Sequence, residues 1–253
     1  MSYPKSLTGN VALIIGGAGA IGAATCRMLA RAGATVALTH MPGADRVAKA
    51  GKVIEDLAGH GHAAFMADVA DSATLLALRT SIEHRYRRLD ILINAAGFTK
   101  PVPHADLEAL TDELIDRMFQ VNWRGQFAAI RTFAPMLKAS RDGVIVSISS
   151  IAAFTGVGSS IAYCAAKAGI DVMTKALARA LAPEVRVLAV SPGVVDTAFV
   201  PGRGADFNDK VAASTPLQRV GDAEDIAAAI TACITMLGYS TGHIVQVDGG
   251  RPL

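Results

Sequence analysis

The chain has 253 residues, of which 51% are hydrophobic and 18% charged, and its formal net charge is +2. This composition excludes an intrinsically disordered chain, and the length suits a single α/β domain. Basic and acidic residues nearly balance and form no basic block, so we expect no binding of nucleic acid or membranes. Cys26, Cys164 and Cys233 lie far apart without a CxxC pair, which predicts no disulfide framework and a reducing, cytoplasmic location.

An uncharged stretch from Val11 to Cys26 could pass for part of a signal peptide. It contains four glycines between residues 16 and 22, however, and Arg27 follows at once, which argues against an apolar helix. No other uncharged run reaches the roughly 20 apolar residues of a membrane-spanning helix. We therefore expect a soluble, unprocessed protein.

Short apolar, β-branched segments alternate along the chain with longer segments of helical periodicity. Several of the short segments are apolar throughout, which is typical of strands covered on both faces. The predicted strands are residues 11–15, 35–39, 63–67, 91–93, 144–148, 185–190 and 244–247, and the predicted helices are 21–31, 45–57, 72–86, 112–138, 162–182 and 223–237. The alternation predicts one doubly wound α/β domain over residues 1–253, with a parallel sheet and helices on both faces. Glycines and a proline mark a loop around residues 197–215.

A glycine-rich turn joins the first predicted strand to the first predicted helix. Gly17, Gly19 and Gly22 fit the pattern GxGxxG. Glycines there permit a tight turn and let backbone N–H groups approach a pyrophosphate at a helix N-terminus. The pattern alone could be only a turn, but its place between a strand and a helix favours nucleotide binding.

Two more polar motifs follow predicted strands. Asp68 and Val69 come after the third strand, and Asn94-Ala95-Ala96-Gly97 comes after the fourth. The carboxyl ends of parallel strands gather on the ligand side of an open α/β sheet. Taken singly, Asp68 could instead cap a helix, and the segment from 94 to 97 could be an ordinary turn.

Ser150 follows the fifth predicted strand, and Tyr163 and Lys167 come later in the next predicted helix. Tyr163 and Lys167 are four residues apart and therefore share one helix face. An ammonium near a phenol favours the phenolate and lowers the phenol pKa from about 10, which suits proton exchange near neutral pH. An isolated Tyr-x-x-x-Lys pattern is more often a solvated helix face, but the preceding Ser150 and the glycine turn favour a catalytic group.

With these motifs the sequence resembles the main branch of the short-chain dehydrogenase/reductase family. Within that branch it is most similar in character to the subgroup of 3-oxoacyl-carrier-protein reductases. The resemblance covers residues 7–252, through the segments 16–22, 68–69, 94–97, 121–122, 148–150, 163–167, 191–193 with Thr197, 216–226, 241–242 and 247–250. It implies a Rossmann-type domain with a seven-stranded parallel sheet. It also implies hydride transfer between a nicotinamide cofactor and a secondary alcohol or ketone.

The resemblance further implies a catalytic tetrad of Asn122, Ser150, Tyr163 and Lys167. In it Tyr163 is the general acid/base, Lys167 lowers its pKa and binds the nicotinamide ribose, Ser150 stabilises the substrate oxygen, and Asn122 holds a relay water. Cofactor contacts are implied for Tyr163 and Lys167 and for Gly16, Gly19, Ala20, Ile21, Gly22, His40, Asp68, Val69, Asn94, Ala95, Gly97, Pro192, Gly193, Val195 and Thr197. No metal site is expected.

Four residues depart from the family pattern. Ile15 replaces a threonine, Ala20 the middle glycine of GxxxGxG, Ala95 the second asparagine of Asn-Asn-Ala-Gly, and Ser191 an asparagine before Pro-Gly. None of them belongs to the tetrad, so the departures bear on cofactor affinity rather than on catalysis.

The choice between the two nicotinamide cofactors depends on the end of the second strand. NAD users of the family typically place an aspartate there, whereas this chain has His40, followed by Met41 where many NADP users have an arginine. Without a carboxylate nothing there obviously repels a 2′-phosphate, which His40 or Arg46 could reach. NADP(H) is therefore favoured, and NAD(H) stays open.

A non-catalytic nucleotide sensor or scaffold on the same fold is the alternative function, although a sensor has no need of all four tetrad residues. A dehydratase or epimerase fits less well. The substrate is not identified. An apolar pocket could be lined by Phe98, Phe154, Val157, Phe199 and Val200, unless these are ordinary core, and an acidic substrate could be held by Lys100, His104, Arg203 or Lys210, unless these are only solvated.

The predicted helix 162–182 is apolar on more than one face, so its second face needs a partner. The helix 112–138 offers apolar neighbours, and the strand 244–247 would leave an apolar edge exposed in a monomer. The family pairs these helices in dimers and often joins dimers through that strand. We therefore expect a homotetramer, with a dimer as the alternative, unless these residues fill the core of the monomer.

Overall fold

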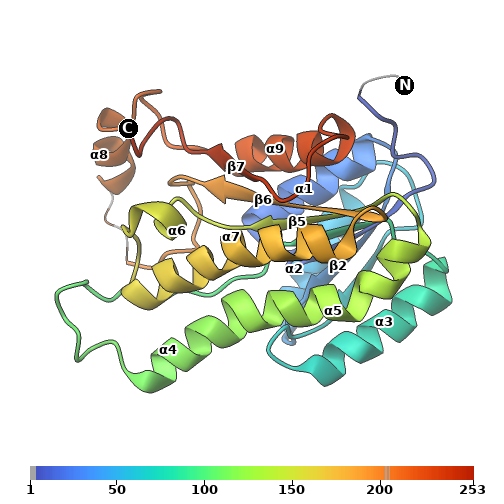
Figure 1. Cartoon of the computed structure of the whole chain (residues 1–253), viewed down its shortest axis with the longest axis horizontal. Helices are drawn as coiled ribbons and strands as arrows, with labels where there is room; N and C mark the ends of the chain where they lie inside the picture. Colours follow the sequence, from blue (N-terminus) through green and yellow to red (C-terminus); the bar gives the residue numbers. More distant parts are fainter. Residues whose placement is uncertain (1–3, 203, 205) are drawn as a thin grey trace.

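The computed structural model describes residues 4–202, 204 and 206–253. Seven parallel strands form one sheet in the order β3-β2-β1-β4-β5-β6-β7 (Figure 1). They are β1 (Val11–Ile15), β2 (Thr35–His40), β3 (Ala63–Met66), β4 (Ile91–Asn94), β5 (Gly143–Ile148), β6 (Val185–Pro192) and β7 (Ile244–Val247). The chain starts in the middle of the sheet and reverses direction between β1 and β4. This topology confirms the predicted doubly wound domain and places a ligand crevice at the switch point.

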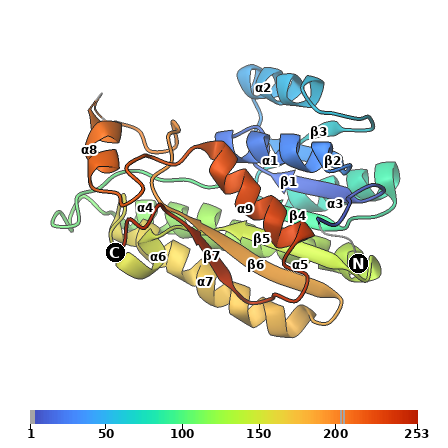
Figure 2. The same ribbon diagram turned by 90° about the horizontal axis from the view of Figure 1, so that it is seen from above.

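Helices cover both faces of the sheet (Figure 2). One face carries α1 (Ala20–Arg31), α2 (Ala44–Glu55) and α9 (Ala223–Thr235), and the other carries α3 (Ser72–Tyr86), α5 (Gly125–Ala139) and α7 (Ile161–Leu181). The helix α4 (Asp112–Phe119) precedes α5, and the short helices α6 (Ala152–Thr155) and α8 (Phe207–Ala213) lie in the connections after β5 and β6. In the described part of the chain, no helix is both long and apolar enough to cross a membrane.

The central strands are buried on both faces because each contributes apolar side chains to two cores. In β1, Ile14 packs among α1, α2 and α9, whereas its neighbour Leu13 packs among α3, α5 and α7. Both side chains are fully buried, and burial of each stabilises the fold by about 1.5–3 kcal/mol. The uninterrupted apolar segments of the sequence therefore mark the middle of the sheet.

The predicted helix 112–138 is wrong as one continuous helix. A π-helical turn, η1 (Gln120–Arg124), separates α4 from α5. Inside it, the Asn122 side chain donates to the carbonyl of Met118 at 2.9 Å, the carbonyl that a regular helix would give to the main-chain N–H of residue 122. The side chain therefore competes with the backbone for this acceptor, and the helix widens by one residue there.

The predicted loop 197–215 holds a short helix, α8, that sequence analysis missed. Pro201, Gly202 and Gly204 lie before it. Arg203 and Ala205 lie outside the described residues. Elsewhere the predicted elements agree with the structure to within one or two residues at their ends.

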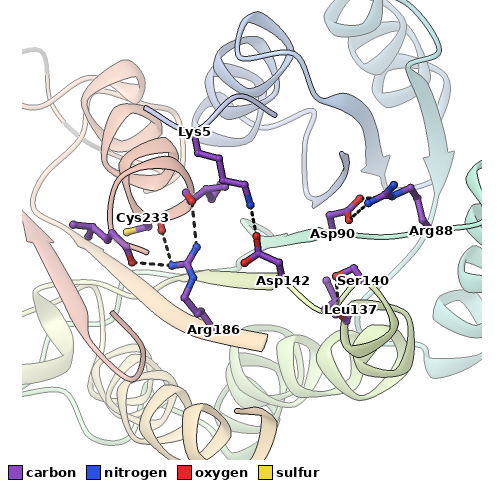
Figure 3. Close-up of polar contacts among 10 residues, drawn as sticks. Lys5, Arg88, Asp90, Leu137, Ser140, Asp142, Arg186 and Cys233 are labelled. Atoms are coloured by element: carbon purple, nitrogen blue, oxygen red, sulfur yellow. Dashed lines mark hydrogen bonds and ion pairs between the residues drawn. The ribbon is translucent and has the colours of Figure 1, made fainter. Parts of the chain in front are cut away.

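Charged side chains join elements at the amino ends of the strands (Figure 3). Lys5 pairs with Asp142, which lies just before β5. Arg88 donates two hydrogen bonds to the buried carboxylate of Asp90, which also accepts the main-chain N–H of Val11 at 2.8 Å. At the edge opposite the ligand crevice, Asp90 thus joins β4 to β1, and Lys5 joins the segment before β1 to the start of β5.

In the same region, Arg186 of β6 makes hydrogen bonds to the C-terminal end of α9 (Figure 3). Its guanidinium donates to the carbonyls of Cys233 (2.9 Å), Leu237 (3.0 Å) and Ile234 (3.2 Å). Cys233 and Ile234 lie in the last turn of α9, where carbonyls lack a partner within the helix. Leu237 lies just beyond the helix, and its carbonyl also accepts the N–H of Ser240 at 3.1 Å. The arginine is therefore a C-terminal cap supplied from the sheet.

We expect Arg186→Met to lower the free energy of unfolding by about 1.5–3 kcal/mol, because charged hydrogen bonds to the end of α9 are lost. Urea denaturation followed by circular dichroism measures the change. Arg79→Met is the matched control, since Arg79 lies on α3 without a hydrogen bond or ion pair in the described structure; it is expected to change stability by less than about 0.5 kcal/mol. Equal losses in both variants would show that the cap contributes nothing.

Candidate active site

A cavity of about 1190 Å³ extends along the carboxyl ends of the central strands. Its lining starts at the glycine turn, passes the ends of β4, β5 and β6, and reaches α8 and the C-terminal residues. The predicted site residues that line it are Gly19, Ala20, Ile21, Gly22, Ala95, Gly97, Ser150, Tyr163, Lys167, Pro192, Gly193, Val195 and Thr197. The predicted residues outside the lining are Gly16, His40, Asp68, Val69, Asn94 and Asn122.

The glycine turn is packed too closely for side chains. A Cβ on Gly22 would lie 2.3 Å from the carbonyl oxygen of Gly16, and a Cβ on Gly16, where φ is +81°, would lie 2.7 Å from the nitrogen of Ala96. Gly19 precedes α1 and provides no side-chain cap. The first N–H groups of α1 therefore face the cavity without a side-chain acceptor, an arrangement that fits the pyrophosphate of a dinucleotide.

The residues behind the lining make local contacts. Asp68 accepts a hydrogen bond from the N–H of Ala70 at 2.8 Å, so its carboxylate stabilises the turn before α3. Asn94 donates to Ser147 of β5 at 3.3 Å, while its buried Oδ1 has no hydrogen-bond partner in the described structure. One ring nitrogen of His40 lies 2.9 Å from the carbonyl oxygen of Met41.

Tyr163 and Lys167 lie on one face of α7, as predicted from their spacing. Ser160 starts the helix by accepting the N–H of Tyr163 at 3.1 Å. The Lys167 ammonium is 5.6 Å from the centre of the Tyr163 ring and donates to the carbonyl of Ile148, at the end of β5, at 2.7 Å. Lys167 is only 3% exposed, and this burial lowers its pKa to about 8, against the charge of Asp171, which raises it.

Ser149 and Asp171 form a second link between β5 and α7 that sequence analysis missed. The Ser149 hydroxyl donates to the Asp171 carboxylate at 2.5 Å and also lies 3.4 Å from the carbonyl oxygen of Lys167. Burial raises the pKa of Asp171, while Ser149 and the lysines of α7 lower it. Asp171 continues the spacing of Tyr163 and Lys167 by four residues, which was the available sequence signal. Both links hold the chain directly before Ser150.

Asn122 is buried beside this cluster, and both its amide hydrogens and its carbonyl oxygen make hydrogen bonds. Its Nδ2 donates to the carbonyls of Phe98 (2.8 Å) and Met118 (2.9 Å), and its Oδ1 accepts the N–H of Phe98 at 3.0 Å. The side chain therefore fastens the segment after β4 to η1, next to Gly97 of the cavity lining.

The cavity has two cationic residues that the sequence did not single out. Lys49, on α2, lines it near the glycine turn, and Arg251, after β7, lines it near α8. Neither lies in a motif, and each reaches the cavity only because of the fold.

The glycine turn and the uncapped N-terminus of α1 fit a dinucleotide, and Ser150, Tyr163 and Lys167 line the same cavity. A family model described as enoyl-(acyl carrier protein) reductase matches residues 16–251. A ketoacyl reductase of the granaticin polyketide synthase from Streptomyces violaceoruber is 35% identical over 96% of both chains. The cis-4-hydroxycyclohexanecarboxylate dehydrogenase of Sinomonas cyclohexanicum is 35% identical over 95% of this chain and 96% of that protein.

Among solved structures, a short-chain dehydrogenase/reductase from Burkholderia xenovorans is 33% identical, with a TM-score of 0.90 over 98% of this chain and 99% of that one. The chain therefore belongs to the short-chain dehydrogenase/reductase family, as its motifs indicated. It is an NAD(P)-dependent oxidoreductase that acts on alcohol or ketone groups.

The charge of Asp171, which raises the pKa of Lys167, predicts a pH effect. Asp171→Asn keeps an acceptor for Ser149 but removes a negative charge that raises the pKa of Lys167. In the variant the Lys167 pKa falls below its value of about 8, so the ammonium is lost at lower pH. We expect the alkaline limb of the kcat–pH profile to move to lower pH, as steady-state assays from pH 6 to 10 would show.

The control for this prediction is Asp56→Asn at the exposed end of α2, which removes the same charge from a residue that does not line the cavity. A shift of similar size in the control would mean that the overall charge, and not the charge of Asp171 near Lys167, sets the profile.

Proposed function

We propose that the chain interconverts a secondary alcohol and a ketone with Tyr163 as the general acid/base. The observation that carries the proposal is the buried Lys167 ammonium, 5.6 Å from the Tyr163 ring centre, in a cavity that Ser150 also lines. When bound, the nicotinamide cofactor supplies or accepts the hydride.

Tyr163 holds the exchangeable proton at its phenol oxygen, which donates to the substrate oxygen in reduction and accepts from it in oxidation. The Lys167 charge favours the phenolate because the two groups are close and Lys167 is removed from water. Ser150 is half-exposed to the cavity and hydrogen-bonds the same substrate oxygen. Since both amide hydrogens of Asn122 are already used, a relay water there would need its Oδ1 or a main-chain group.

The acid/base assignment predicts that Tyr163→Phe folds and binds cofactor but loses about 10³-fold or more in kcat. The ring and its contact with Phe199 are kept, while the only proposed proton donor is removed. Absorbance of the reduced nicotinamide measures turnover, and quenching of protein fluorescence measures cofactor binding. A variant that retains a tenth of the wild-type kcat would reject Tyr163 as the acid/base.

We also propose that the preferred cofactor is NADP(H). His40, rather than a carboxylate, ends β2, and the Lys49 side chain lines the cavity near the glycine turn. Arg46 lies one turn earlier on α2. These side chains favour a 2′-phosphate at this end of the cavity, because nothing among them repels it.

This preference predicts that His40→Asp weakens NADPH binding relative to NADH, by about tenfold or more. A carboxylate repels a phosphate dianion but accepts hydrogen bonds from ribose hydroxyls. Isothermal titration gives the ratio of the two dissociation constants. His40→Asn is the uncharged control. An unchanged ratio in His40→Asp would show that residue 40 does not contact the adenosine ribose.

Three coarser proposals follow the family. The segment 197–215 is the substrate loop, since its helix α8 lines the cavity. The assembly is a homotetramer, or else a dimer, because Phe119, Ile161 and Val172 expose apolar surface on α4 and α7 and β7 is an edge strand. The location is the cytoplasm, which suits three free cysteines.

A further inference from the structure

The end of the cavity farther from the glycine turn is apolar. Val157, Phe199, Val200 and Phe207 line it, and the Phe199 ring centre is 6.2 Å from that of Tyr163. Figure 1 shows the C-terminus beside α8, and in Figure 2 both lie to the left of α2, at the other end of the molecule. This end therefore offers apolar surface beside Tyr163.

Arg251 is a charged residue in this apolar end. Its Nη1 donates to the Ser214 hydroxyl at 2.9 Å and has longer contacts with the Val211 carbonyl (3.4 Å) and the Thr215 hydroxyl (3.5 Å). All three acceptors are neutral, and they lie in the last turn of α8 or directly after it. They orient the guanidinium, and within the described residues its Nε and Nη2 have no hydrogen bond.

No carboxylate in the described residues pairs with Arg251. Asp248 is the nearest acidic residue in sequence, and its Oδ1 accepts the N–H of Gly250 at 2.8 Å. Lys210 of α8 is paired with Asp206. Arg251 is therefore a half-buried cation without a counter-charge, and a guanidinium in such a place attracts an anion with two oxygens in one plane.

The two lysines of the cavity lining lie away from Arg251. Lys167 is bound to the Ile148 carbonyl beside Tyr163, and Lys49 lies near the glycine turn. In the described lining, Arg251 thus supplies one positive charge to the substrate end. One charge balances a single carboxylate, whereas a coenzyme A thioester, with several phosphate charges, would need more cations.

We propose that Arg251 forms a carboxylate subsite and that the substrates are compact ketones or alcohols with a carboxylate remote from the reacting carbon. The proposal rests on the proposed function, because it requires the reacting carbon to lie at Tyr163. The apolar side chains around Phe199 then contact the hydrocarbon between the two ends.

The test compares two ketones of the same shape, 4-oxocyclohexanecarboxylate and the neutral 4-oxocyclohexanecarboxamide, with the same cofactor. The wild-type enzyme is expected to have the higher kcat/KM with the carboxylate. Arg251→Met should lower the carboxylate-to-amide ratio of kcat/KM by about 10–100-fold, mainly through KM, because a charged hydrogen-bond pair is lost. Arg251→Lys should keep part of the preference, since it retains the charge without the planar fork.

Two further variants separate binding from structure. Arg79→Met removes an arginine distant from the cavity and should leave the ratio unchanged. The double variant Ser214→Ala/Thr215→Val removes hydroxyl acceptors of Arg251 but keeps its charge, so the preference should persist. If Arg251→Met does not fold, the wild-type enzyme still tests the subsite: added NaCl should raise KM for the carboxylate and not for the amide.

Equal losses with both ketones in Arg251→Met, or no carboxylate preference in the wild-type enzyme, would overturn the subsite. So would a clear preference for acetoacetyl-coenzyme A over both cyclohexanones. Failure of the proposed function looks different: no ketone of any kind, charged or neutral, would then be reduced with either nicotinamide cofactor.

Discussion

The site depends on one buried hydrogen bond, from the Lys167 ammonium to the Ile148 carbonyl. Removing an ammonium from water costs several kcal/mol unless polar groups compensate it. Here the carbonyl at the end of β5 and the charge of Asp171 do so. The same bond fixes the distance between α7, which carries Tyr163, and β5, which leads to Ser150. Burial also lowers the pKa of Lys167 to about 8, so the charge on its ammonium depends on pH just above neutrality.

The parallel sheet explains why residues far apart in the sequence share one cavity. All seven strands run in the same direction, so the glycine turn after β1, the Asn94 segment after β4, Ser150 after β5 and Pro192 at the end of β6 reach the same edge. The amino ends of the strands hold ion pairs and caps instead, such as Arg186 against α9. Stability contacts and chemistry are thereby placed at opposite edges of the sheet.

The side chain of Asn122 shapes both the helix that contains it and the cavity wall. Its side chain takes the Met118 carbonyl from the helix backbone and opens a π-helical turn. The same amide binds both main-chain groups of Phe98. A residue expected to hold a water therefore also positions the segment after β4, and its replacement would disturb the cavity wall as well as any relay.

The sequence by itself determined the parallel α/β architecture, the glycine turn and the pairing of Tyr163 with Lys167. Strand burial and helical spacing are local patterns, and they can be read from neighbouring residues. The π turn at Asn122, the helix α8 and the link from Ser149 to Asp171 were decided only by the tertiary structure, because each depends on contacts between separate elements. Arg251 is the clearest case: no motif marks it, and it becomes a cation of the cavity only because β7 ends beside α8.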